Sequence, residues 1–100
     1  MNLKAGVLSN KKYAKFSLGQ TIATPNALSK LTSEDILKAL DRHVAGDWGE
    51  TSKEEQNENE HSLKKEFRLL SIYRGDNGTK FWILTEADRS LTTVLLPEDY

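Results

Sequence analysis

The sequence predicts an α+β domain in which N-terminal helices pack on an antiparallel meander of three to four strands. Two observations carry this prediction. Between residues 32 and 49 apolar residues follow helical spacing, and capping residues precede this segment and its neighbours. From Phe67 onward the period changes to two, and aromatic and β-branched stretches alternate with turn residues. A chain of 100 residues fits one domain, so we expect residues 1–100 to form a single unit.

The first 20 residues carry the weakest pattern of the chain. The stretch KYAKFSLGQTIATP holds Tyr13, Phe16, Leu18 and Ile22, with a break at Gly19. We expect residues 1–20 either to be poorly ordered or to supply an extra strand.

Helical signals follow Pro25. Thr24 and Asn26 are both candidate caps for one helical turn over ALSKL. In TSEDILKALDRHVAGDWG, either Thr32 or Ser33 is the N-cap, Gly46 ends the helix, and one apolar stripe comprises Ile36, Leu37, Leu40 and Val44. The stretch SKEEQNENEHSLKKE is polar nearly all round, which fits either a surface helix beginning after Ser52 or a disordered linker.

Three strands are expected in FRLLSIYR, KFWILTE and LTTVLL. Asn77-Gly78 is the favoured pair for a two-residue type I′ hairpin, and a four-residue turn is expected at 87–90. This register pairs Ile72 with Ile83 and Thr85 with Thr92. One face then carries Leu70, Ile72, Phe81, Ile83, Val94 and Leu96, with Arg68, Thr85 and Thr92 at one end. The other face carries Phe67, Leu69, Ser71, Tyr73, Trp82, Leu84, Thr93 and Leu95.

The register matters because a one-residue change in either turn reverses the faces. Both predicted faces are largely apolar, and the amphipathic helix can cover only one of them. The N-terminal strand, the second helix or a second copy of the chain must therefore cover the other face, and the last of these predicts a homodimer.

A polar cluster is expected where Arg68, Thr85 and Thr92 converge, with Arg89 and Ser90 at its rim. A guanidinium surrounded by hydroxyls is suited to an anion or phosphate. The ordinary structural alternative is that the threonines pair across strands, Asp88 and Ser90 cap the turn, and Arg68 pairs with Glu66 or Glu86.

His43 lies seven residues after Ile36, at the flank of the apolar stripe. One hypothesis makes it a general acid or base near neutral pH. The alternative is a histidine of the last helical turn, satisfied by a carbonyl or favoured by the helix dipole.

Composition excludes several classes of function. The net charge of -1 disfavours a broad electrostatic surface for nucleic acid. With no cysteine there is no disulfide, thiol catalysis or cysteine zinc site, which fits a cytoplasmic location. No apolar run is long enough to span a membrane. His43 and His61 have no metal-ligand spacing, and no phosphate loop or dinucleotide pattern is present, so we expect no metal and no cofactor.

The strings ATPNALSKL, RHVAGDWGE, NEHSLKKEFRLLSIYR and KFWILTEADRSLTTVLLPEDY resemble a family of small uncharacterised bacterial proteins related to plasmids and other mobile elements. The resemblance covers roughly residues 22–100 and implies a mobile-element context, but no activity. Members typically carry a glycine before FRLL, where this chain has Glu66.

Two hypotheses follow, and they leave open whether the protein is an enzyme. In the first, a mobile-element accessory protein binds a host or defence-system protein through the second sheet face and the acidic segment 54–60. In the alternative, a small metal-independent ribonuclease toxin acts on RNA through His43, Arg68, Thr85, Arg89 and Thr92. Residues expected in binding are Trp48, Tyr73, Trp82, Asp88, Ser90 and Thr93.

Overall fold

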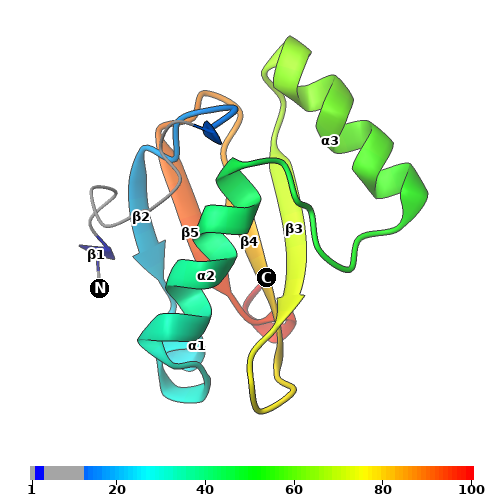
Figure 1. Ribbon diagram of the computed structural model, residues 1–100. Coiled ribbons are helices and arrows are strands. Elements are labelled where there is room, and N and C mark those ends of the chain that lie inside the picture. The colour runs from blue at the N-terminus through cyan, green and yellow to red at the C-terminus, as the bar shows by residue number, and fades with distance from the viewer. Residues whose placement is uncertain (1, 4–12) are drawn as a thin grey trace.

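The computed structural model describes residues 2–3 and 13–100. Three helices, α1 (Pro25–Lys30), α2 (Ser33–Val44) and α3 (Lys53–Lys65), accompany a mixed sheet. Its strands are β1 (Asn2–Leu3), β2 (Gln20–Ala23), β3 (Leu69–Arg74), β4 (Lys80–Thr85) and β5 (Leu91–Leu95), in the spatial order β1-β2-β5-β4-β3 (Figure 1). A short 3-10 helix, η3 (Pro97–Asp99), follows.

The predicted α+β class is confirmed. Strands β3, β4 and β5 form the antiparallel meander, and β2 joins β5 in parallel. In Figure 1, α2 lies in front of the sheet with α1 at its lower end, whereas α3 lies beside β3. β2 lies in the stretch KYAKFSLGQTIATP, directly after the break expected at Gly19, and the expectations for residues 1 and 4–12 lie outside the described residues.

Both long helices begin with a capping box. The Thr32 hydroxyl accepts from the Asp35 N–H at 3.0 Å, and the Asp35 carboxylate accepts from the Thr32 N–H at 3.1 Å. Ser52 and Glu55 make the same reciprocal pair at the start of α3. The segment after Ser52 is therefore a helix, and the linker alternative is wrong.

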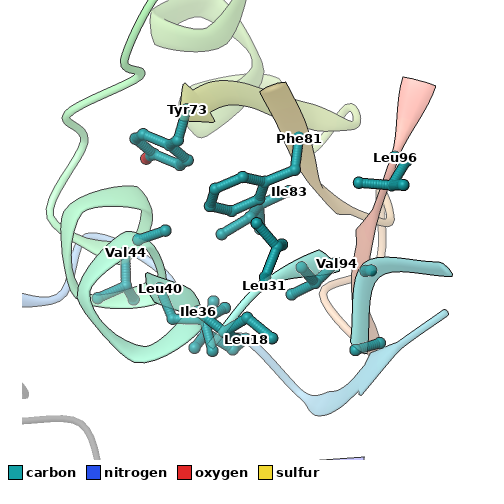
Figure 2. Close-up of a cluster of buried hydrophobic side chains, with 13 residues drawn as sticks. Leu18, Leu31, Ile36, Leu40, Val44, Tyr73, Phe81, Ile83, Val94 and Leu96 are labelled. Carbon is teal, nitrogen blue, oxygen red and sulfur yellow. The ribbon is translucent and has the colours of Figure 1, made fainter. Parts of the chain in front are cut away.

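The core lies between α2 and the face of the sheet that this helix covers. Figure 2 shows the side chains of α2 directed toward those of the strands. This cluster includes Ile36, Leu40 and Val44 of α2 with Tyr73, Phe81, Ile83 and Val94 of the sheet. All seven are at most 2% exposed, so three residues of the predicted stripe lie on the buried face of the helix, while Leu37 is only partly buried against the cluster.

The register of the first hairpin differs from the prediction by one residue. Ile72 pairs with Trp82 rather than with Ile83. The loop has three residues, because the Gly75 N–H donates to the Thr79 carbonyl and the Gly78 N–H donates to the Gly75 carbonyl. Gly78 alone in this loop has a positive φ, of 85°, whereas a type I′ turn needs positive φ at both central residues.

Contacts from outside the hairpin account for this loop. The Asn77 side-chain amide donates to the Lys30 carbonyl at 3.1 Å, at the end of α1. The Asp35 carboxylate accepts from the Asp76 N–H at 3.1 Å. Hydrogen bonds from α1 and α2 thus fix the conformation of this turn. These contacts come from distant parts of the chain, so the preferences of the turn residues alone do not reveal them.

This shift reverses the predicted faces of β3. Leu69, Ser71 and Tyr73 are buried on the helix side, while Leu70 and Ile72 are partly exposed on the other side. The second hairpin follows the prediction, with Thr85 opposite Thr92.

Glu66 ends α3 in the left-handed conformation, with φ of 58°. An L-residue is strained there and glycine is not, so Glu66→Gly should raise the free energy of unfolding by about 0.5–1 kcal/mol in urea titrations. Lys64→Gly, two residues earlier in the last turn of the same helix, is the control and should lower it by a similar amount. Destabilisation by Glu66→Gly would show that the side chain, not the backbone, governs this position.

Candidate functional site

A chain of buried polar side chains connects α2 to the sheet. The His43 ring lies 2.6 Å from the Ser71 hydroxyl through Nδ1 and 2.9 Å from the Thr85 hydroxyl through Nε2. The Thr85 and Thr92 hydroxyls are 2.8 Å apart, and Thr92 donates to the Leu18 carbonyl at 2.7 Å. The four side chains are each 0% exposed.

The proton positions follow from counting donors. A hydroxyl has one proton. Because Thr92 gives its proton to Leu18, Thr85 must donate to Thr92, and His43 must then donate to Thr85 from Nε2. Neutral His43 therefore accepts from Ser71 at Nδ1, so every polar atom of the ring is satisfied.

Burial favours the neutral imidazole. It lowers the pKa of His43 from 6.5 to about 3, and the positive charge of Arg89 adds to the shift. A general base must also reach the proton it removes. In this structure both ring nitrogens are occupied by protein groups and the ring has no exposed surface.

Arg68 does not join this cluster. The reversed face of β3 places it on the opposite side of the sheet from Thr85 and Thr92, which corrects the predicted convergence. Its guanidinium donates to the Tyr100 hydroxyl at 3.2 Å and lies 3.6 Å from the Glu86 carboxylate. The expected pairing with Glu86 is thus present.

Arg89 ties the β4–β5 turn to the end of α3. Its guanidinium donates to the carbonyls of Ser62 at 2.9 Å and Phe67 at 2.6 Å, and to two carbonyls of its own turn. In the same turn the Asp88 carboxylate accepts from the Ser90 N–H and hydroxyl at 3.0 and 2.6 Å. The bonds between Asp88 and Ser90 lie within the turn, and the Arg89 donors are directed at backbone carbonyls of the turn and of the end of α3.

The aromatic residues expected in binding divide into two groups. Trp48 and Tyr73 are 5% and 2% exposed and belong to the interior. The Trp48 indole donates to Glu60 at 2.8 Å, and Tyr73 donates to the Asp47 carbonyl. Trp82 is partly exposed on the second face, as is Thr93.

The second face of the sheet carries several apolar side chains and is here called the open face. It is made by Arg68, Leu70, Ile72, Trp82, Leu84, Thr93, Leu95 and Tyr100. Helices α1 and α2 both pack on the opposite face. On the open face Leu84 and Leu95 are nevertheless buried, at 8% and 5% exposure, whereas Leu70, Ile72 and Trp82 are partly exposed. A hollow of about 290 Å³ lies on the open face between Arg68, Leu70, Trp82, Leu84 and Tyr100.

The outer edge of β3 is covered by polar groups. The Asn59 side chain on α3 donates to the Leu70 carbonyl at 2.7 Å and accepts from the Leu70 N–H at 3.1 Å. Ile72 bonds to the Trp48 carbonyl and the Glu50 N–H at 3.2 and 2.7 Å. The edge therefore offers a partner few free backbone groups, whereas the open face is accessible.

Sequence reasoning missed Asn59 and Ser71 as structural partners. Asn59 lies in a polar helix, and nothing in its spacing distinguishes it from Asn57. Ser71 had been assigned to the wrong face by the hairpin register.

Within residues 2–3 and 13–100, no three histidine or carboxylate side chains gather as a metal site would require. No helix in the described part combines the length and apolar composition needed to cross a membrane. Comparison of the chain with family models, curated proteins and solved structures finds no match.

Proposed function

We propose that this protein is a non-catalytic binding module that holds another protein against the open face. The observation that carries the proposal is the set of partly exposed apolar side chains on the sheet face opposite α1 and α2. Phe67 and Tyr100 are 55% and 71% exposed at its margin, and Leu70, Ile72 and Trp82 are partly exposed within it. Exposed aromatic residues around an apolar centre are typical of protein interfaces.

A different protein is a better occupant than a second copy. A two-fold dimer would bring this same surface from two molecules together. The surface is flanked by acidic residues of α3, including Glu54 and Glu58, so two copies would add like charge at the contact. A partner with basic residues beside an apolar patch avoids that repulsion.

The ribonuclease hypothesis has less support. It needs a titrating, accessible His43 near Arg68, whereas His43 is buried and Arg68 lies on the other face. The arginine of the turn, Arg89, directs its donors at four carbonyls rather than at solvent.

The resemblance to plasmid-related proteins gives this module a context. We propose that its partner is a host or defence-system protein encountered by a mobile element. Binding alone suits such a role, because occupying a surface of the partner is enough to change what that partner contacts.

Trp82→Glu and Ile72→Lys test the open face. Each is expected to abolish the specific retention of bacterial proteins by the immobilised protein, because a charge in the apolar centre loses its water on binding. Lys30→Glu, on an exposed position of α1, is the control and should retain the same proteins as the wild type.

Quantitative mass spectrometry of the retained proteins is the measurement, with circular dichroism to verify folding. Identical retained sets for the wild type, Trp82→Glu and Ile72→Lys would contradict the proposal. Sedimentation of a wild-type dimer that both substitutions convert to monomer would instead assign the open face to self-association.

A further inference from the structure

A second concave surface adjoins the open face at Arg68. This α3 groove has a volume of about 780 Å³ and lies between one side of α3 and the entry to β3. Its lining residues are Glu54, Asn57, Glu58, His61, Ser62, Phe67, Arg68 and Ala87. Arg68 also lines the hollow beside Trp82, so the two surfaces are continuous.

The groove has an apolar side. Phe67 follows Glu66, the residue that ends α3, and is 55% exposed. Its carbonyl accepts a hydrogen bond from the Arg89 guanidinium at 2.6 Å, which fixes the backbone at this position. The centroid of its ring lies 6.0 Å from that of the His61 ring, and both residues line the groove. A large aromatic side chain held in place at the surface is the kind of residue that anchors a binding partner.

The helical side of the groove is acidic. Glu54 and Glu58 are one turn apart, both are exposed, and neither makes an ion pair with another described residue. Carboxylates at this spacing repel each other and weaken the helix slightly. The lining contains one arginine, Arg68, and its guanidinium is engaged by Tyr100 and Glu86.

The spacing of the carboxylates constrains the occupant. Four residues of α-helix advance about 6 Å along the axis. Basic residues at i and i+4 of a helix have the same separation, and those at i and i+2 of an extended strand are about 6.7 Å apart. An apolar side chain on the adjoining side of such a segment would face Phe67 and Ala87.

We propose that the α3 groove binds a cationic, amphipathic segment of the partner protein, with two basic residues facing Glu54 and Glu58 and an apolar residue on Phe67. This inference rests on the proposed function and assigns the chemistry of the partner. Phosphate-bearing ligands are disfavoured, because the same carboxylates repel them.

The test uses a designed helical peptide with a leucine stripe and lysines at i and i+4, and a second peptide in which glutamates replace the lysines. Titration calorimetry gives the affinities. The lysine peptide should bind the wild type, and Glu54→Lys/Glu58→Lys should weaken that binding at least tenfold, because two attractions become repulsions. The glutamate peptide should prefer the reversed variant.

Glu34→Lys/Asp76→Lys is the matched control, because it changes the net charge equally at exposed positions that do not line the groove. It should alter the affinity less than threefold. Amide shifts in NMR spectra should change at Asn57, His61 and Phe67 when the lysine peptide binds.

Three outcomes would overturn the inference: no binding of the lysine peptide at millimolar concentration, equal binding of both peptides, or shifts restricted to the open face. None of them removes the open face as a binding surface. That proposal fails separately, if Trp82→Glu and Ile72→Lys leave the retained proteins unchanged.

Discussion

Lowering the pH from 7 to 4.5 should remove about 3 kcal/mol from the free energy of unfolding, because His43 must stay neutral in the fold. The folded pKa is about 3, against 6.5 for the ordinary side chain. Between these values the unfolded chain binds the proton and the folded chain does not. The stabilisation is thus complete above about pH 6.5 and falls by about 1.4 kcal/mol per pH unit below it. Urea unfolding at pH 7, 5.5 and 4.5 measures the slope.

His43→Gln supplies the decisive comparison. A glutamine amide can donate and accept in the same chain of hydroxyls but does not titrate. We expect it to lower stability at pH 7 by about 1–3 kcal/mol and to flatten the dependence between pH 6.5 and 4.5. His61→Gln, at an exposed position, should keep the wild-type slope. An unchanged slope in His43→Gln would contradict this account.

The carboxylates act in a lower range of pH. Hydrogen bonds from the Thr32 backbone lower the pKa of Asp35, and the guanidinium of Arg42 lowers that of Asp47. A depressed carboxyl pKa contributes stability that is lost only as pH falls below the ordinary value of 3.8. The window between pH 6.5 and 4.5 therefore reports mainly on His43.

Asn59→Leu should lower the free energy of unfolding by about 2–4 kcal/mol. The side chain is 4% exposed and bonds both the N–H and the carbonyl of Leu70. Leucine has a similar size but leaves both backbone groups without a partner, and each such group costs about 1–3 kcal/mol. Urea titration of the variant measures the loss.

Hydrogen exchange of the Leu70 amide adds a local readout, because this amide should lose protection in Asn59→Leu. Asn57→Leu, two residues earlier at an exposed position, should change stability by less than about 0.5 kcal/mol. If the two variants were equally stable, the bonds to Leu70 would contribute little to the attachment of α3.

Helix starts and the core stripe were predictable because their signals are local. The hydroxyls of Thr32 and Ser52 bond N–H groups three residues away, so the spacing of capping residue and acid is visible in the sequence. The pairing of Thr85 with Thr92 was also predicted correctly, because the turn at 87–90 has the expected four residues.

The first hairpin was not predictable in the same way. Asn77-Gly78 has the local preference of a two-residue turn, but Lys30 and Asp35 bond the loop from distant helices and leave three residues in it. One extra residue moved Ser71 beneath His43 and turned Arg68 away. The candidate site was thus half predicted: its histidine and threonines meet, and its arginines do not join them.

The place of β5 between β2 and β4 affects the order in which the protein can fold. β2 finds its parallel partner about 70 residues later in the chain. During synthesis, residues 20–23 therefore cannot pair with β5 until residues 91–95 have left the ribosome. A two-stranded ribbon alone is marginally stable, so β1 and β2 gain little before then. Such distant pairing slows folding, and for that interval the nascent chain exposes the surfaces of α1 and α2 that later form the core.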